Sequence, residues 1–490
     1  MKEYDIEFAI IGAGFAGIIA AMQLAKKSYS DYTIFERASS VGGTWRDNTY
    51  PGCACDVSSY LYSIKEAPNP NWTKMYSSQA EILTYLKDVV TKNDIENHIV
   101  YNTEILEMQF DSNEAIWHLK DQNNKVYKAK FVLMAQGPLN RAVIPNFKGL
   151  DLFKGKYFHT SNWDHSCDLK NKKVAIIGTG ASAIQVIPNI ADQVNKLHVI
   201  QRTAAWILPR ANPEIGATTK KMYSLFPFLE KMRREYIYWT NEFFGLAFIG
   251  NKFVNRIASN FALSYLKRKV TDETLRKKLT PTYTFGCKRV LLSKTYYPTF
   301  NKQQVSLHST TISEIKEHSI ILENKEKLEV DVIIMATGFE AAELQVHTKI
   351  LGVDGRNLID RWKEEGVSAY KGCITHDVPN LFFILGPNTG LGHNSVLHMM
   401  ESQMYYILDY IKQSKKLPSK SYLNLKLQVE EAYNKKLQSD LIGTVWNSGC
   451  KSWYLNSRGV NTTIYPRLNN RFRKEMKSFN LSDFHQYNNQ

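Results

Sequence analysis

The stretch Ile10-Ile-Gly-Ala-Gly-Phe-Ala-Gly17 decides the fold of the chain. An apolar run precedes it, which is typical of a buried parallel strand, and a helix is predicted after it over residues 18–26. Within the stretch, Gly12 permits a tight turn, Gly14 lets the backbone approach a pyrophosphate, and Gly17 permits close packing of helix on strand. The order of strand, turn and helix predicts a Rossmann-like dinucleotide-binding unit.

The same pattern returns at Ile176-Ile-Gly-Thr-Gly-Ala-Ser-Ala183. Its first glycine, Gly178, stands 166 positions after Gly12 (178 − 12 = 166), and Gly180 keeps the same register. An apolar run again precedes the glycines, and a helix is predicted to follow. The chain is therefore predicted to bind two dinucleotides, each at a helix N-terminus whose free N–H groups attract phosphate.

The residue that ends the second strand differs between the two copies. Glu36 follows Gly12 by 24 positions (36 − 12 = 24), and Arg202 follows Gly178 by the same number (202 − 178 = 24), with Thr203 next in the chain. A carboxylate at this point accepts hydrogen bonds from ribose hydroxyls and repels a 2′-phosphate, whereas an arginine attracts that phosphate. The first copy is predicted to take FAD, with NAD as the alternative, and the second to take NADP(H).

Two loop segments, residues 41–45 and 50–56, are rich in glycine and aromatic residues and too apolar for simple surface loops. Asp56 stands among these apolar neighbours. It either caps a loop or belongs to an active site, and the sequence leaves both interpretations open.

Residues 212–286 change the character of the chain, because amphipathic helices rich in aromatic and basic residues are predicted over 220–248 and 253–279. Such helices are typical of a membrane-surface or hydrophobic-substrate element. A helical insertion packed on its own domain is the favoured interpretation. After it, Lys288 and Arg289 point to opposite sides of an extended chain, so one can reach a phosphate and the other a reacting centre, unless both are solvated.

The net charge of +15 over 490 residues raises the question of an anionic partner. Nucleic acid or an anionic membrane would fit such a charge. The sequence has no arginine-rich block or nucleic-acid motif, so bound dinucleotides and a solvated lysine surface are the favoured explanation. No nucleic-acid partner is expected.

The six cysteines predict no disulfide framework. Cys53 and Cys55 have the spacing of neither a redox pair nor a zinc site, so reduced thiols and no metal are expected. The N-terminal segment lacks the pattern of a signal peptide. A cytoplasmic location is the expectation.

The segment between the two copies, Phe153-Lys-Gly-Lys-Tyr-Phe-His-Thr-Ser-Asn-Trp-Asp164, carries the pattern Phe-x-Gly-x-x-x-His-x-x-x-Trp-Asp. With two dinucleotide fingerprints on either side, it resembles the class B flavoprotein monooxygenases of the Baeyer–Villiger type. The resemblance covers nearly the whole chain and is weakest in the helical insertion and after Ser457. We expect His159 to anchor this linker rather than to act as an acid or base.

The resemblance implies an α/β fold with two Rossmann-like dinucleotide-binding domains. It implies that the FAD domain is discontinuous, over residues 1–142 and 341–490, with a mobile C-terminal loop in its second part. The NADP domain would be inserted over residues 143–340 and would carry the helical insertion at about 212–286.

The resemblance also implies an activity. NADPH and O₂ would be used to insert one oxygen atom next to a ketone carbonyl, through a C4a-peroxyflavin, to give an ester or lactone. Arg289 would be the active-site arginine, Asp56 would orient it, and Trp453 would lie in the mobile loop over the nicotinamide. The implied cofactor-binding residues are Gly12, Gly14, Gly17, Glu36, Thr44 and Trp45 for FAD, and Gly178, Gly180, Ser182, Arg202, Thr203, Lys288 and Trp453 for NADP(H). Asp56 is also counted among the cofactor-binding residues.

Three other functions are weighed against this one. An oxygenase of sulfides or amines, or a hydroxylase of long-chain substrates, would use the same cofactors. A pyridine nucleotide–disulfide reductase would need a redox-active cysteine pair, which Cys53 and Cys55 are not spaced to form. A non-catalytic flavin-binding or membrane-surface protein has only the basic helical insertion in its favour.

Overall fold

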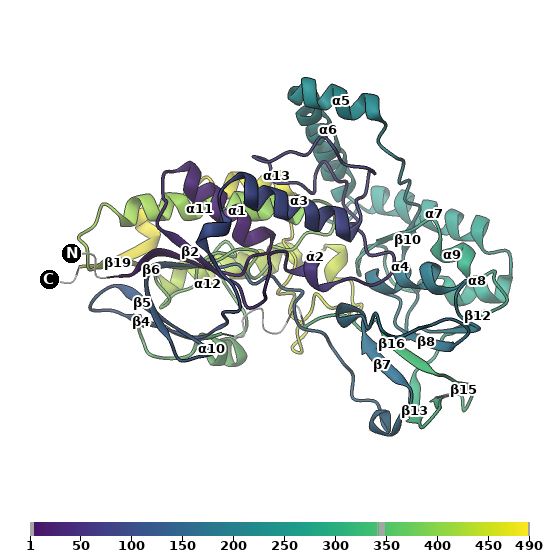
Figure 1. The fold of residues 1–490 in the computed structure, drawn as a ribbon. Coiled ribbons are helices and arrows are strands. Elements are labelled where there is room, and N and C mark those ends of the chain that lie inside the picture. The colour runs from purple at the N-terminus through teal and green to yellow at the C-terminus, as the bar shows by residue number, and fades with distance from the viewer. Residues whose placement is uncertain (1–3, 341, 343–347, 489–490) are drawn as a thin grey trace.

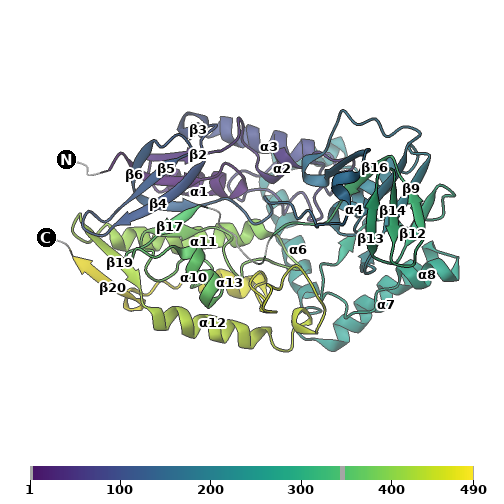
Figure 2. The same cartoon turned by 90° about the horizontal axis from the view of Figure 1, so that it is seen from below.

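The computed structural model of the chain describes residues 4–340, 342 and 348–488, and it has two main sheets at opposite ends of the molecule (Figures 1 and 2). The larger sheet has eight strands in the order β17-β4-β5-β6-β1-β2-β3, with β18 also paired to β6. Its strands are β1 Ile6–Ile11, β2 Tyr32–Phe35, β3 Ile99–Val100, β4 Ile105–Asp111, β5 Ile116–Asp121, β6 Val126–Met134, β17 Lys349–Leu351 and β18 Leu381–Phe383.

The second sheet has five strands, all paired in parallel, in the order β12-β9-β8-β16-β7. Its strands are β7 Lys156–His159, β8 Lys173–Ile177, β9 Lys196–Ile200, β12 Val305–His308 and β16 Val332–Met335. The central strands are continuous apolar runs because helices and loops cover both faces of a parallel sheet. These two sheets confirm the predicted α/β fold with two Rossmann-like units.

The first strand of each fingerprint lies in the middle of its sheet and leads directly into a helix. In the first unit, Ile10 of β1 pairs with Ile34 of β2 and Leu133 of β6, and α1 (Phe15–Lys26) follows. In the second unit, β8 lies between β9 and β16 and is followed by α4 (Ala181–Ile190). The glycine turns therefore open at the carboxyl ends of the parallel strands, where ligands bind in such sheets.

The chain crosses between the two sheets twice, and the two crossings lie side by side. Val143 donates its N–H to the carbonyl of Gly338 (2.9 Å), and Glu340 donates to the carbonyl of Arg141 (3.0 Å). Ala142 and Phe339 form an isolated β-bridge between them. The connection is therefore a short two-stranded ribbon rather than two independent loops.

The linker between the fingerprints forms the edge of the second sheet. Its strand β7 pairs with β16, so that His159 lies opposite Met335. The imidazole of His159 packs edge-on against the ring of Phe339, with centroids 5.6 Å apart, and burial lowers the pKa of its side chain. These contacts place His159 against the domain connection and outside the cavity described below, in the position of an anchor.

The helical insertion contains more helices than were predicted. The two predicted helices are four, namely α5 Ala217–Leu225, α6 Pro227–Gly245, α7 Lys252–Lys269 and α8 Glu273–Leu279. Pro227 begins α6 because proline cannot continue a helix but fits its first turn. Asp272 caps α8 by accepting a hydrogen bond from the N–H of Leu275 (2.6 Å).

The remaining elements surround the two sheets. Helix α11 (Val396–Ser414) packs on α1, over the larger sheet. Among the described residues no helix combines the length and apolar character needed to cross a membrane. The other helices are α2 Thr44–Asp47, α3 Gln79–Lys92, α9 Tyr296–Thr299, α10 Leu358–Glu365, α11 Val396–Ser414, α12 Leu427–Leu441 and α13 Asn469–Glu475, and the other strands are β10 Ile207–Leu208, β11 Leu291–Leu292, β13 Ile312–Lys316, β14 Ser319–Leu322, β15 Lys327–Glu329, β19 Ser421–Leu425 and β20 Phe484–Asn488.

Candidate active site

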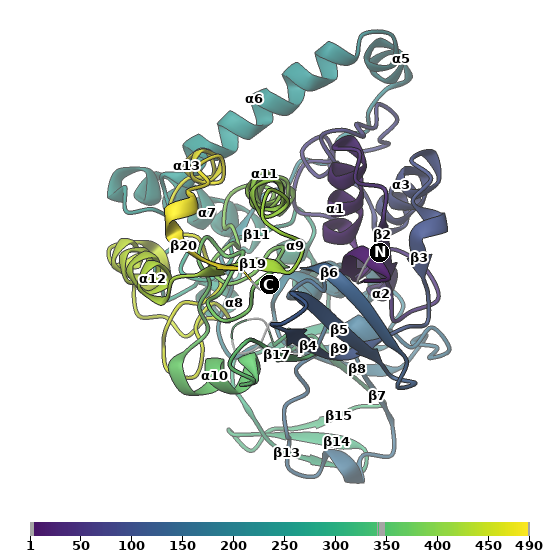
Figure 3. The same cartoon turned by 90° about the vertical axis from the view of Figure 1, so that its left-hand side faces the viewer.

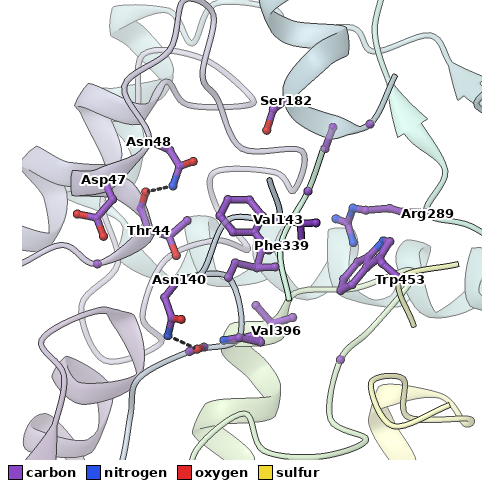
Figure 4. Close-up of a pocket in the computed structure, with 18 of the residues that line it drawn as sticks. Thr44, Asp47, Asn48, Asn140, Val143, Ser182, Arg289, Phe339, Val396 and Trp453 are labelled. Atoms are coloured by element: carbon purple, nitrogen blue, oxygen red, sulfur yellow. Dashed lines mark hydrogen bonds between the residues drawn. The ribbon is translucent and has the colours of Figure 1, made fainter. Parts of the chain in front are cut away.

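A single cavity of about 1000 Å³ is lined by both fingerprints (Figure 4). It opens at the carboxyl ends of β1 and β8 and continues between the two glycine turns. Two dinucleotides bound there would lie in one continuous space. Of the residues predicted to bind cofactor or substrate, those lining the cavity are Gly12, Gly14, Glu36, Thr44, Trp45, Asp56, Gly178, Gly180, Ser182, Arg202, Thr203, Lys288, Arg289 and Trp453.

Gly17 does not line the cavity, and the structure gives it a packing position instead. A Cβ atom at Gly17 would lie 1.9 Å from the carbonyl oxygen of Gly12, so only glycine lets α1 approach the turn this closely. Gly12 itself has φ +109°, a conformation that side chains rarely adopt. Its own Cβ would meet the carbonyl oxygen of Ala135 at 2.8 Å.

Glu36 is buried, and protein donors already hold its carboxylate. Ala13 donates its N–H to Oε2 (2.8 Å), Ala38 donates its N–H to Oε1 (3.0 Å), and Arg46 pairs with Oε1 (3.0 Å). Oε1 already has two donors, whereas Oε2 has one and keeps a further lone pair for a ligand hydroxyl. The carboxylate is thus fixed at the end of β2, where it can accept a hydrogen bond from a ribose. The residues around the first glycine turn therefore fit the adenosine part of FAD. Arg46 was not singled out from the sequence.

The floor of the first half comes from the loop after Val41. Thr44 begins the short helix α2, and Trp45 is buried with its indole N–H donated to the hydroxyl of Tyr62 (3.1 Å). Gln79 donates to the Trp45 carbonyl from helix α3. These contacts fix the loop rigidly against the cavity.

The second glycine turn is more open than the first. Gly178 has φ +112° and its Cβ would meet the carbonyl oxygen of Ala336 at 2.4 Å, but a Cβ at Gly180 would have no neighbour within 4 Å. Helix α4 starts after Gly180 without a side-chain cap, so its first N–H groups are free to meet an anion. Ser182 lies in this first turn and lines the cavity.

Two cations meet beside the second turn. Arg202 is exposed and Lys288 is half-buried. Burial first, and then the charge of Arg202, lower the pKa of Lys288, so the two charges are close enough to repel each other. A dianionic phosphate placed between them would remove this repulsion. The pair therefore fits the 2′-phosphate of NADP(H).

Arg289 and Asp56 come from different parts of the chain and meet in the cavity. The Arg289 Nε donates to Oδ2 of Asp56 (2.9 Å), and Nη2 donates to Oδ1 (2.8 Å) and Oδ2 (2.7 Å). The charge of Asp56 raises the pKa of the guanidinium above its ordinary value. Asp56 thus pairs with Arg289 inside the cavity, and its role there stays a prediction.

The C-terminal loop closes one wall of this region. Trp453 points into the cavity (Figure 4) and is 41% exposed. Its neighbour Tyr454 is buried, and burial raises the pKa of that phenol to about 12 while the nearby charge of Arg289 opposes the rise. The loop thus brings an aromatic ring to the cavity and a buried phenol to the side of Arg289.

A disulfide joins the two loops that carry these residues, which corrects the expectation of reduced thiols only. Cys287, two residues before Arg289, is bonded to Cys450, three residues before Trp453. Their separation of 163 positions leaves no spacing signal in the sequence. The bond ties the arginine loop to the C-terminal loop.

The other cysteine pair near the cavity has no redox character. Cys53 and Cys55 are free, and burial raises the pKa of Cys53 to about 11 and the pKa of Cys55 still further. Thiols of this kind form few thiolate nucleophiles near neutral pH. The disulfide reductase alternative has no support at this position.

Gln185, on helix α4, joins the second fingerprint to the loop that carries Asp56. The hydroxyl of Tyr50 donates to its Oε1 (3.1 Å), and its Nε2 donates to the carbonyl of Ala54 (2.9 Å). Sequence reasoning missed this residue. Gln185 lies one helical turn after Ala181, which places it on the side of α4 that lines the cavity. This spacing is the only feature of the sequence that could have indicated it.

Comparison with known proteins identifies the family of this site. A family model described as flavin-binding monooxygenase-like matches residues 6–455. The chain belongs to this family. It is 42% identical to a Baeyer–Villiger monooxygenase of Pseudomonas aeruginosa over 479 residues, which is 97% of this chain and 90% of that protein. A Baeyer–Villiger monooxygenase of Streptomyces coelicolor is 38% identical over 98% of the chain and 92% of its own length.

Solved structures agree with this assignment. The crystal structure of the OTEMO complex with FAD and NADP (form 3) superposes with a TM-score of 0.87, at 26% identity, over 99% of this chain and 100% of that chain. The closed crystal structure of cyclohexanone monooxygenase superposes with a TM-score of 0.85, at 26% identity, over 96% of each chain. The predicted Baeyer–Villiger resemblance and the FAD- and NADPH-dependent monooxygenase class are confirmed.

Proposed function

We propose that this flavin-binding monooxygenase converts a ketone to an ester or lactone and that Arg289 and Asp56 carry the oxygenation step. One observation supports the proposal most strongly. The guanidinium of Arg289 is held by Asp56 inside the cavity that both glycine turns line. The balance is one ketone, one O₂, one NADPH and one proton, giving one ester, one water and NADP⁺.

Bound FAD and NADPH supply the hydride transfer and the activation of O₂. The protein supplies charge and geometry. Arg289 keeps a permanent positive charge, which stabilises negative charge that develops at the reacting oxygen atoms. Asp56 is a positioning residue because its three hydrogen bonds fix the plane of that guanidinium.

The remaining predicted residues divide between the two cofactors. Glu36, Thr44 and Trp45 would hold FAD with the first glycine turn. The second turn with Ser182, Arg202, Thr203 and Lys288 would hold NADP(H), and Trp453 would cover its nicotinamide. The similarity to Baeyer–Villiger monooxygenases, and to solved structures that contain FAD and NADP, supports this division.

The test is the variant Arg289→Ala, assayed with cyclohexanone and methyl phenyl sulfide side by side. We expect it to retain FAD, seen as flavin absorbance after gel filtration, and to lose lactone formation by about 1000-fold, because one electrostatic stabiliser is typically worth 100- to 1000-fold. Arg141→Ala is the matched control, since Arg141 pairs with Glu340 at the surface. Normal lactone yield from Arg289→Ala would refute the role of Arg289. Sulfoxide without lactone from the wild type would instead favour the heteroatom oxygenase.

A further inference from the structure

Helix α6 has the opposite polarity to an ordinary surface helix. Its buried positions are mainly polar or charged, and they recur at helical spacing as Glu230, Arg234, Tyr238 and Glu242. The face that points away from the protein is apolar and aromatic. Helix α6 therefore packs on the protein through its polar face.

The polar face is fixed by specific partners. Arg234 donates to the carbonyls of Tyr60 and Ser63, both at 2.8 Å, and lies 3.7 Å from Glu401. Glu242 pairs with His393 at 3.1 Å. Rotating the helix would take Arg234 and Glu242 away from their partners and leave Glu401 buried without a counter-charge, which is costly. The apolar face is therefore held outward by the structure itself.

Nine large apolar side chains of residues 222–244 form what we call the aromatic ridge, and each is at least 39% exposed. They are Met222, Leu225, Phe226, Phe228, Met232, Tyr236, Trp239, Phe243 and Phe244. On α6 the stripe runs at steps of four, four, three and four residues from Phe228 to Phe243, so it occupies one helical face. Figures 1 and 3 show α5 and α6 at the periphery, with α5 at the far end of α6. A patch of this size marks an interaction surface.

The charges beside the ridge are mostly positive. Lys220, Lys221, Lys231 and Arg233 are exposed or half-buried, while Glu235 is the only acidic residue of helices α5 and α6 that is not buried. Two copies of this face brought together about a twofold axis would place like charges against each other. Aromatic residues flanked by lysine and arginine instead match an anionic bilayer surface.

We propose that the aromatic ridge docks this monooxygenase on the surface of an anionic lipid bilayer. Helix α6 lies in the plane of the interface with its aromatic side chains among the headgroups and upper acyl chains. The lysines and Arg233 face the anionic headgroups, and the buried charges keep the helix attached to the protein. The proposal does not depend on which substrate the enzyme oxidises.

The proposal is tested by flotation of the FAD-loaded full-length protein with two kinds of vesicle. One kind is pure phosphatidylcholine, which is neutral, and the other is phosphatidylcholine in which one quarter of the lipid is anionic phosphatidylglycerol. We expect binding to the anionic vesicles that decreases as salt rises. The triple variant Tyr236→Ser/Trp239→Ser/Phe243→Ser should lose at least 10-fold in vesicle affinity. Its matched control replaces three exposed apolar residues elsewhere, Leu152→Ser/Leu427→Ser/Ile442→Ser, and should bind as the wild type does.

The charges are tested separately. Lys220→Gln/Lys221→Gln/Lys231→Gln should weaken binding to anionic vesicles by about 100-fold, since each lysine near such a surface contributes roughly fivefold. Lys316→Gln/Lys325→Gln/Lys327→Gln, on the β13–β15 sheet, is the matched control. NADPH oxidation in solution should be equal in all variants, which shows that they are folded.

Three results would overturn the proposal. The first is no flotation of the wild type with either vesicle, and the second is equal loss in the ridge variant and its control. The third is a wild-type dimer in light scattering without lipid that the ridge variant abolishes, since the ridge would then be covered by a second copy.

Discussion

The two dinucleotide-binding sites, which we call the first cradle (around Gly12 and Glu36) and the second cradle (around Gly178 and Arg202), have the same residue spacing. They differ in how many protein partners hold their key side chain. In the first, Glu36 is buried and already bonded to Ala13, Ala38 and Arg46. In the second, the matching residue Arg202 is exposed and faces another cation, Lys288. The first is a closed, self-supported site and the second is an open site where two cations lie close together. This difference is that expected between a resident cofactor and an exchanging coenzyme.

The glycines show the same contrast. The third position of the pattern is Gly17 in the first copy and Ala183 in the second, 166 positions later (183 − 17 = 166). Ala183 is fully buried, whereas a Cβ at Gly17 would overlap the Gly12 carbonyl at 1.9 Å. The first helix therefore lies closer to its turn than the second does.

Separate substitutions at these two positions should show the largest difference in stability between the two cradles. Gly17→Ala must push α1 away from the turn, and we expect it to lower the free energy of unfolding by about 3 kcal/mol and to reduce bound FAD. Ala183→Gly should cost only about 1 kcal/mol, the difference in helix propensity. Chemical denaturation and the flavin-to-protein ratio measure both. Equal losses from the two changes would show that the cradles are packed alike.

Removing the two cations of the open cradle should have the next largest effect. Arg202→Ala/Lys288→Ala is expected to weaken NADPH binding by about 100-fold or more, because each charge-assisted hydrogen bond contributes about 1.5–3 kcal/mol. NADH, which lacks the 2′-phosphate, should change by less than about threefold. Dissociation constants from coenzyme titration decide this, with Lys325→Ala/Lys327→Ala as the control. Similar losses for the two coenzymes would contradict the assignment.

The features that could be predicted from the sequence are those encoded locally. The strand, glycine turn and helix around residues 10–26 were predicted, and the contrast between Glu36 and Arg202 follows from a fixed 24-residue offset. Both are consequences of a strand–turn–helix unit whose geometry sets the spacing. The pairing of Asp56 with Arg289 came from the family resemblance, because no local pattern relates residues 233 positions apart.

The features that could not be predicted depend on tertiary contacts. The Cys287–Cys450 bond joins loops 163 positions apart, and the hydrogen bonds of Gln185 cross between the two units. The buried face of α6 could not be read from its apolar stripe, because such a stripe normally faces the core. Here partners from distant segments, such as Glu401 for Arg234, hold the polar face inward.

Glu36→Gln tests whether the closed cradle depends on a carboxylate. A glutamine keeps one acceptor oxygen and turns the other position into a donor, so one of the bonds from Ala13 and Ala38 is lost. We expect FAD affinity to fall by about 10-fold with NADPH affinity unchanged. Reconstitution of the stripped protein with FAD measures this, and Glu107→Gln, which removes only a surface pair with Lys349, is the control. An equal fall in NADPH affinity would show that the cradles are coupled rather than distinct.

The smallest effect should come from the proton on Lys288. Burial and the charge of Arg202 lower its pKa, so this lysine loses its charge at a lower pH than an exposed lysine would. Since only the protonated form attracts the 2′-phosphate, NADPH affinity of the wild type should decline by a few-fold as the pH rises through the lowered pKa of this lysine. Lys288→Arg carries a guanidinium that does not titrate in this range and should keep the affinity flat. NADH lacks the 2′-phosphate, so its affinity, measured in parallel, should stay constant over the same pH range. If the wild type and Lys288→Arg decline together, the titrating group lies elsewhere, and the open cradle owes its selectivity to Arg202 alone.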